Sequence, residues 1–395
     1  MRTLALAKSG LNKLRSHSRE LKSSDLEDSI RSLTPGEWCL FQTTSDPERW
    51  MGFANPLIEE KFTSVYVLKS FSGTSSISPA DYIKDSLEKA YNKRMRFHDY
   101  KNGCRLVYGL SDGLPGLIVD SFKNACVIQI NTAGLDQHRE FIKAEVARLS
   151  GKTSYLLDND KYRSKESLPN YSKDILPDLE IEENGILFSL RSEIVQKVGF
   201  YYDHRENRRQ LMLLLERMNK FKHGVDLFCY AGAWGLSALK GGTARMDFVD
   251  QGDLSHEVKT GLEKNGVIDR GSFYRSDVFK FLDQKISDGT KFDLLLCDPP
   301  AFAKSLSQKK EALEGYSKLH RKVFKVAGEK ALIAFSSCTH YVDHQEFQKN
   351  ILDAAQKENK KIQLLYCGLQ GWDHPVSSLE EKSNYIKSYF YLMES

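Results

Sequence analysis

The feature that most constrains the fold is the alternation of short apolar runs and helical segments in the second half of the chain. From about residue 191, strand-like runs recur at 224–230, 245–250, 272–277, 292–298 and 331–338, with helical segments between them. Continuous apolar strands joined by helices are typical of a parallel sheet that is covered on both faces. Two further strands, "KIQLLYCGL" and "NYIKSYFYLM", are expected to add an antiparallel edge. The pattern predicts a doubly wound, Rossmann-like α/β domain that binds its ligands at the carboxyl ends of the strands.

The chain before this pattern predicts two smaller domains. Residues 1–75 contain short β-like runs separated by turn residues, which indicate a small β-rich domain. The stretch "SGTSSISPA", Ser72–Ala80, has the composition of a linker. A helical segment and several strands follow and predict a middle α/β domain. The expected domains are therefore 1–75, 80–190 and 191–395, and 395 residues are enough for all three.

Composition narrows the class of protein. Hydrophobic residues make up 41% and charged residues 28% of the chain, which is ordinary for a soluble globular protein. Apolar runs stay well short of the ~18–20 residues of a membrane helix, and the start lacks a secretory apolar core. The seven cysteines are odd in number and none is spaced C-x-x-C, which argues against a disulfide framework and a zinc site. We expect a cytoplasmic protein with no metal and no membrane partner.

Positive charge is concentrated in two stretches. The net charge is only +4, but residues 1–20 hold five Lys or Arg against one acid, and residues 203–223 hold six against three. Clustered cations are the usual footprint of phosphate binding. A solvated helix face is an equally good interpretation of either stretch taken singly.

The first strand of the doubly wound pattern ends in a glycine-containing loop, "CYAGAWG", Cys229–Gly235. Gly232 and Gly235 allow a tight turn into a helix and a close approach of the backbone to a ligand. The loop is not the dinucleotide fingerprint G-x-G-x-x-G, and Trp234 stands where a pyrophosphate would need room. The loop therefore favours a cofactor without phosphates.

Acidic residues end the next two strands. Asp250 lies 18 residues after Gly232, the approximate distance at which an acid takes ribose hydroxyls. Asp277 ends the third strand and is a candidate acceptor for an adenine amine. A glycine loop, a ribose acid and an adenine acid without a phosphate cradle together predict S-adenosylmethionine as the cofactor.

The fourth strand ends in Asp298-Pro299-Pro300-Ala301-Phe302. The prolines stiffen the turn and remove backbone donors. Asp298 can then accept hydrogen bonds from the edge of a nucleic-acid base, and Phe302 can stack on a base that has left its helix. The simpler interpretation is a proline turn that closes a strand.

Cys338 ends the fifth strand in "SSCTHY", next to the Asp298 strand in the usual order. A thiolate there can attack C6 of a pyrimidine and make C5 nucleophilic enough to take a methyl group. Cys297 lies inside an apolar strand and is expected in the core. His340 could help to deprotonate Cys338 or be a loop histidine, and Asp373-His374-Pro375 could accept the C5 proton or form a turn.

These motifs as a set resemble a known family, the ribosomal RNA large-subunit methyltransferase I type. The matching stretches run from about Gly109 onward over some three quarters of the chain: "GLSDGLPGLIVDSF", "QKVGFYYDHRENRR", "DLFCYAGAWGLSAL", "DVFKFL", "DPPAF", "SSC" and "DHPV". Enzymes of this type are class I methyltransferases that make 5-methylcytosine in bacterial 23S ribosomal RNA.

The resemblance implies a PUA-like first domain, a middle α/β domain and a class I methyltransferase domain. It implies RNA as the partner, with 23S ribosomal RNA as the substrate. A homodimer is one candidate assembly, which the sequence does not fix. The expected catalytic residues are Cys338 and Asp298. The residues expected to bind the cofactor are Phe200, Tyr230, Gly232, Gly235, Asp250, Asp277, Asp298 and Pro299. Those expected to bind the substrate are Phe302, Arg205 and Arg208.

Two other functions stay open. An enzyme that methylates a ring nitrogen or exocyclic amine of an RNA base would also use an acid-Pro-Pro-aromatic motif, but it would need no thiol. An RNA-binding assembly factor with a lapsed methyltransferase fold would need none of the strand-end residues. The presence of the whole set, with Cys338, favours methylation of cytosine C5.

Overall fold

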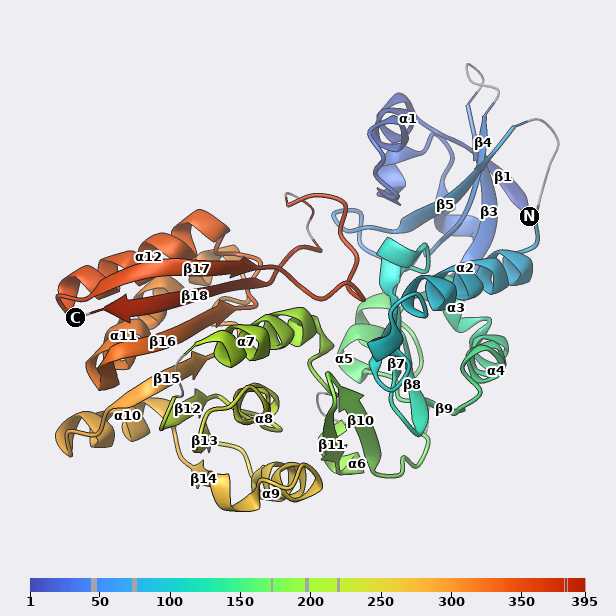
Figure 1. Ribbon diagram of the computed structural model, residues 1–395. Coiled ribbons are helices and arrows are strands. Elements are labelled where there is room, and N and C mark those ends of the chain that lie inside the picture. Colours follow the sequence, from blue (N-terminus) through green and yellow to red (C-terminus); the bar gives the residue numbers. More distant parts are fainter. Residues whose placement is uncertain are drawn as a thin grey trace. The chain divides into compact units, whose positions relative to one another are not determined.

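The computed structural model describes the chain except for residues 44–47, 73–76, 172, 196–198, 219–220, 380, 382 and 395. Part of the expected linker and part of the "QKVGF" motif therefore lie outside the described residues. The chain forms two compact units, Met1–Pro177 and Asp178–Ser395 (Figure 1). None of the helices in the described ranges is long and apolar enough to cross a membrane.

The first unit begins with a five-stranded sheet in the order β1-β3-β4-β5-β2. Its strands are β1 (Arg2–Ala5), β2 (Glu20–Leu21), β3 (Glu37–Gln42), β4 (Arg49–Ala54) and β5 (Val65–Phe71), and helix α1 is Lys8–Arg15. The three β-like runs expected from the sequence form β3, β4 and β5. A separate hydrophobic cluster that includes Leu4, Leu14 and Phe41 packs this part of the unit.

A second sheet completes the first unit, in the order β6-β7-β8-β9. It consists of β6 (Cys104–Tyr108), β7 (Leu117–Ser121), β8 (Ala125–Ile130) and β9 (Thr153–Leu156), with helices α2 (Pro79–Arg94), α3 (Ala133–Asp136), α4 (Arg139–Ser150) and α5 (Asp160–Arg163). One core joins the two sheets, because Trp38 and Phe53 pack in the same cluster as Leu87 and Ile128. The division into separate domains at 1–75 and 80–190 stays a prediction.

The second unit is built on a seven-stranded sheet with the order β14-β13-β12-β15-β16-β18-β17 (Figure 1). The strands are β12 (Gly224–Leu227), β13 (Met246–Asp250), β14 (Gly271–Arg275), β15 (Phe292–Cys297), β16 (Ala327–Ser337), β17 (Lys361–Gly368) and β18 (Lys387–Glu394). The first five are parallel, and β18 runs antiparallel to both of its neighbours. The predicted doubly wound sheet with an antiparallel edge is confirmed.

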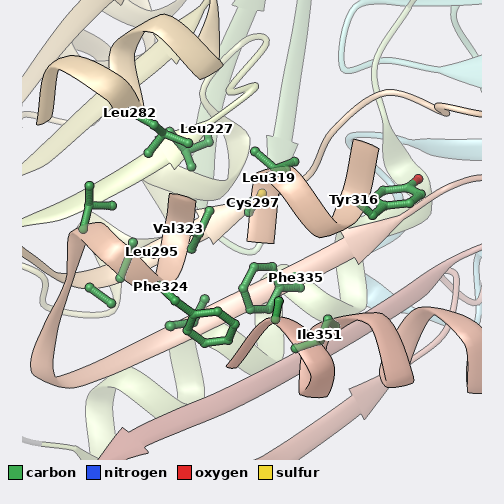
Figure 2. Close-up of a cluster of buried hydrophobic side chains, with 14 of the residues drawn as sticks. Leu227, Leu282, Leu295, Cys297, Tyr316, Leu319, Val323, Phe324, Phe335 and Ile351 are labelled. Atoms are coloured by element: carbon green, nitrogen blue, oxygen red, sulfur yellow. The ribbon is translucent and has the colours of Figure 1, made fainter. Parts of the chain in front are cut away.

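Helices cover both faces of this sheet. The helices α10 (Val278–Ser287), α11 (Lys309–Val326) and α12 (His344–Lys357) pack on one face, and α7 (Arg205–Arg217), α8 (Ala233–Lys240) and α9 (Ser255–Lys264) pack on the other. The core on the first face contains Cys297 of β15 together with Leu319 and Phe335 (Figure 2). Burial on both faces explains why the strands are continuously apolar.

A hairpin of β10 (Leu179–Glu183) and β11 (Ile186–Leu190) precedes the sheet and belongs to the second unit. Asn265 holds it from the end of α9: the Leu187 amide donates to Asn265 Oδ1 at 3.0 Å, and Asn265 Nδ2 donates to the Leu187 carbonyl at 2.8 Å. By its contacts the hairpin lies with the seven-stranded sheet, although the sequence pattern assigns it to the middle domain.

Helix α8 can pack closely on β13 only because position 235 is glycine. Gly232 precedes the helix with φ of +78°, a left-handed conformation that glycine adopts at little cost. A Cβ atom on Gly235 would lie 2.2 Å from the Phe248 ring of β13. Gly235 therefore serves contact between the helix and the sheet.

We expect Gly235→Ala to destabilise the second unit by about 1–3 kcal/mol, because overpacking forces the helix or the ring to move. Thermal unfolding of the full chain measures the effect. Phe248→Leu in the same chain should recover part of the loss, since it removes the ring that the new methyl group meets. Equal stability of wild type and Gly235→Ala would contradict this packing.

Candidate active site

The expected site residues gather because β12, β13, β15 and β16 are parallel strands of one sheet, so their carboxyl ends share an edge. The loop after β12 has left-handed backbone at Phe228 and Tyr230, with φ of 62° and 49°. Such values are uncommon for residues other than glycine and persist where surrounding contacts enforce them. The backbone of this loop is therefore held in a defined shape.

Asp250 supplies part of that restraint from the end of β13. Its Oδ2 accepts a hydrogen bond from the Tyr230 amide at 3.1 Å, and its Oδ1 accepts one from the Gly252 amide at 2.8 Å. The Tyr230 hydroxyl in turn donates to the carbonyl of Gly199. The carboxylate expected to take ribose hydroxyls thus also fixes the glycine loop beside it.

The N-terminus of α8 is closed to a phosphate group. Asp226 of β12 is fully buried, and its Oδ2 accepts the Gly235 amide at 2.8 Å. Burial, followed by the charges of Asp298 and Asp250, raises the pKa of Asp226 well above its usual value. A protein carboxyl group therefore occupies the donor that a pyrophosphate would use. This arrangement fits the expected cofactor without phosphates.

Asp298 follows β15 and is held from two helices. Trp234 Nε1 donates to its Oδ2 at 3.0 Å, and His204 Nε2 lies 3.4 Å from its Oδ1. Burial would raise the pKa of Asp298, but the nearby charge of His204 and the hydrogen bond from Trp234 outweigh it, so the pKa lies below its usual value. Asp298 is therefore an ionised hydrogen-bond acceptor.

The imidazole of His204 has a fixed orientation. Asn207 Nδ2 donates to the Leu369 carbonyl at 2.9 Å and lies 3.2 Å from His204 Nδ1, while Asn207 Oδ1 accepts from the Tyr366 hydroxyl at 3.1 Å. The ring therefore turns Nδ1 toward Asn207 and Nε2 toward Asp298. Burial lowers the pKa of His204, and the nearby Asp298 more than reverses this effect.

The loop that carries Cys338 is anchored on both sides. Tyr316 of α11 and Ser337 share a hydrogen bond of 3.0 Å between their hydroxyl groups, and the Thr339 hydroxyl donates to the Ala303 carbonyl at 2.9 Å. Figure 2 shows Tyr316 as part of the buried cluster. Tyr316, for which the sequence suggests no role, therefore positions the backbone next to Cys338.

The two central cysteines differ in environment. Cys297 is 2% exposed and lies in the core, as expected, and its pKa is raised well above its usual value by burial and by the charges of Asp298 and Asp226. Cys338 is only partly buried. Its pKa is raised to about 12, first by burial and then by the charges of Asp298 and Asp203. Burial and these two carboxylates therefore favour the neutral thiol over the thiolate.

Phe302 is half-buried with one face of its ring on Tyr316, at 4.7 Å between centroids and 29° between planes. A base could stack only on the opposite face. Asp277 caps α10, where its Oδ1 accepts the Lys280 amide at 3.0 Å, and it is exposed. Phe200 and Pro299 are buried. The roles of these residues toward cofactor and base stay predictions.

Arg205 and Arg208 do not reach solvent, which corrects the expectation that they contact RNA. They are 0% and 1% exposed. Arg208 makes a bidentate pair with Glu183 of the hairpin at 2.6 and 2.8 Å, and Arg208 also donates to the Tyr201 carbonyl at 2.9 Å. Arg205 Nε lies 3.7 Å from Glu183 and its Nη1 lies 4.0 Å from Asp373. Both guanidinium groups belong to the scaffold beneath the site.

The sequence also offers the segment Asp373-His374-Pro375 and His340 as candidates for proton transfer. Asp373 and His374 are buried, and Asp373 Oδ1 lies 2.9 Å from His374 Nδ1. The His374 amide donates to the Gly371 carbonyl at 2.8 Å. This arrangement favours the turn over a group that faces a substrate. His340 is exposed, with its ring 5.2 Å from that of Tyr385.

The chain is similar to known proteins in both sequence and fold. A family profile described as S-adenosylmethionine-dependent methyltransferase matches residues 110–334. Proteins named Ribosomal RNA large subunit methyltransferase I, from Aeromonas salmonicida and Aeromonas hydrophila, are 32% and 33% identical over 293 and 296 residues, and each match covers 72% of this chain and 73% of the relative. A putative methyltransferase from Streptococcus mutans has a similar fold, with a TM-score of 0.75, 20% identity and coverage of 99% of this chain and 100% of that one.

The fold and the matched residues define an S-adenosylmethionine-dependent methyltransferase. Within that class, the chain belongs to the family of the proteins named ribosomal RNA large subunit methyltransferase I. The resemblance inferred from the sequence motifs is confirmed.

We expect Asp250→Ala to raise the Kd for S-adenosylmethionine about tenfold to a hundredfold, because hydrogen bonds to a charged acceptor are worth about 1.5–3 kcal/mol. Titration calorimetry on the full chain measures the change. Asp253→Ala is the matched control, since this neighbouring carboxylate is largely exposed. An unchanged Kd in Asp250→Ala would exclude Asp250 from the binding site.

Arg208→Met should lower the free energy of unfolding by about 3–5 kcal/mol, because it leaves Glu183 buried without its bidentate partner. Arg209→Met, at an exposed neighbour, should change stability little. The double variant Arg208→Met with Glu183→Leu should lose less than the sum of the single changes. A stable Arg208→Met protein with only a weaker salt dependence of RNA binding would instead indicate a phosphate contact.

Proposed function

We propose that this chain forms 5-methylcytosine in 23S ribosomal RNA through a covalent bond between Cys338 and the target base. The observation that carries the proposal is the position of Cys338, partly exposed directly after β16, beside the carboxylate that ends the neighbouring strand β15. The names of the relatives support ribosomal RNA as the substrate. A cytoplasmic location and a homodimer remain predictions.

The chain's own residues have separate roles in this reaction. S-adenosylmethionine supplies an electrophilic methyl group. The Cys338 thiolate forms a bond to C6, and the electron pair of the C5–C6 double bond becomes available at C5 for the methyl group. Loss of the C5 proton restores the double bond and returns the electron pair to sulfur. Asp298, held by Trp234 and His204, accepts a hydrogen bond from the exocyclic amine of the base.

Methylation of an amine on an RNA base is the second candidate. The raised pKa of Cys338 favours it, because a thiol that stays protonated is a poor nucleophile. Asp298 and the two prolines would serve that reaction without the thiol. The two chemistries differ in one test, which is whether the enzyme bonds to the base.

RNA that contains 5-fluorocytosine at the target should trap a covalent adduct with wild-type protein. After methyl transfer, C5 carries fluorine and the methyl group and has no proton to lose, so the bond to sulfur cannot break. Cys338→Ala should abolish the adduct and lower turnover by at least a thousandfold, while binding of S-adenosylmethionine stays unchanged. Gel shift under denaturing conditions and mass spectrometry of the RNA give both readouts.

Cys297→Ala is the matched control, because this thiol lies in the core and its loss should lower stability without removing the adduct. Turnover by Cys338→Ala without any adduct in the wild type would favour amine methylation. Absence of S-adenosylmethionine binding in all variants would instead favour the non-catalytic assembly factor.

A further inference from the structure

Lys387 is a buried cation next to the loop that carries Cys338. It begins β18, stands opposite Ser337 in the antiparallel pairing with β16, and is only 3% exposed. Its Nζ donates to the Thr339 carbonyl at 2.6 Å. The pairing and this hydrogen bond place Lys387 against the residues on either side of Cys338 in the chain.

The surroundings of Lys387 differ from those of the buried arginines. Arg94, Arg163 and Arg208 each lie within 3.0 Å of a carboxylate oxygen, and Arg205 lies 3.7 Å from one. Within the part of the chain that the structure describes, the ion pairs to 4.0 Å include none formed by Lys387. Burial of an ammonium group without a close counter-charge is unfavourable. A neutral donor would suffice if the side chain only held the Thr339 carbonyl.

Charges around this pair come from several elements. Asp298 and Asp203 oppose ionisation of the thiol, and the hydroxyl groups of Tyr201 and Tyr316 are also electrostatically coupled to it. Lys387 acts in the opposite direction.

Burial lowers the pKa of Lys387 to about 8, although the charges of Cys338, Asp343 and Glu346 act to raise it. The pKa of His344 is lowered by burial and then by the charge of Lys387. The lysine still carries a positive charge in most molecules at neutral pH.

We propose that Lys387 is a positioning residue whose ammonium group is the counter-charge of the Cys338 thiolate, an inference that rests on the proposed function. The thiol proton leaves to solvent, and the sulfur electron pair then forms the bond to C6. When the C5 proton leaves to water, the electron pair returns to sulfur. Lys387 stays protonated throughout. Its ammonium group faces the negatively charged Cys338 sulfur before the bond to C6 forms and again after that bond breaks.

The rate of alkylation of Cys338 by iodoacetamide tests the proposal, because only the thiolate reacts. The full chain is treated without RNA or cofactor between pH 7 and 9, and each cysteine is followed by mass spectrometry of its peptide. Lys387→Gln keeps a hydrogen-bond donor but removes the charge. It should slow alkylation of Cys338 about tenfold at pH 7, since one pKa unit changes the thiolate fraction tenfold. The difference should shrink toward pH 9, because Lys387 itself loses its charge as the pH rises through about 8. Lys387→Arg should stay close to wild type.

Exposed Cys367 is the internal control, and its rate should not change. Lys387→Met, of similar length, gives a second uncharged side chain if Lys387→Gln fails to fold by circular dichroism. Equal Cys338 rates in wild type and an uncharged variant would overturn the proposal. A slower rate in that variant, with no RNA adduct in the wild type, would support the charge pair and reject the cytosine mechanism. The two failures are therefore distinguishable.

Discussion

The charge on Asp298 is the constraint on which the rest of the site depends. A partly buried carboxylate needs donors around it, and here they come from α8 and from the residue before α7. Trp234 of α8 and His204 before α7 both reach the same carboxylate after β15. This arrangement fixes the ends of β12 and β15 relative to each other.

A second group of buried charged residues links the hairpin to α7. Glu183 of the hairpin binds Arg208 in a bidentate pair and lies close to Arg205, and Arg205 faces Asp373 from a loop far along the chain. In the segment "DHRENRR", His204 faces Asp298, while Arg205 and Arg208 contact acids of the hairpin and of the loop that follows β17. Arg209 is exposed. The buried charges of this segment therefore help to specify the arrangement of the elements around it.

The parts of the site that follow from local pattern were predictable from the sequence. Asp250 and Asp298 each come directly after an apolar run, and Cys297 stands within one, so their positions follow from the strand pattern. The missed interactions join distant residues. Glu183 and Arg208 are 25 residues apart across a predicted domain boundary, and Trp234 and Asp298 are 64 apart. Sequence cannot say which of several nearby cations a buried acid will select, because that choice depends on how the hairpin packs.

The position of β18, between β16 and the edge strand β17, has a consequence for how the protein is made. Ser336 of β16 and Ser388 of β18 are hydrogen-bonded partners 52 residues apart. During synthesis β16 emerges well before the strand that must pair with it, so its edge is open while α12 and β17 are being made. Late closure of such long-range pairing is slow and exposes an aggregation-prone edge. The loop of Cys338 and the lysine beside it therefore come together only once β18 has paired with β16.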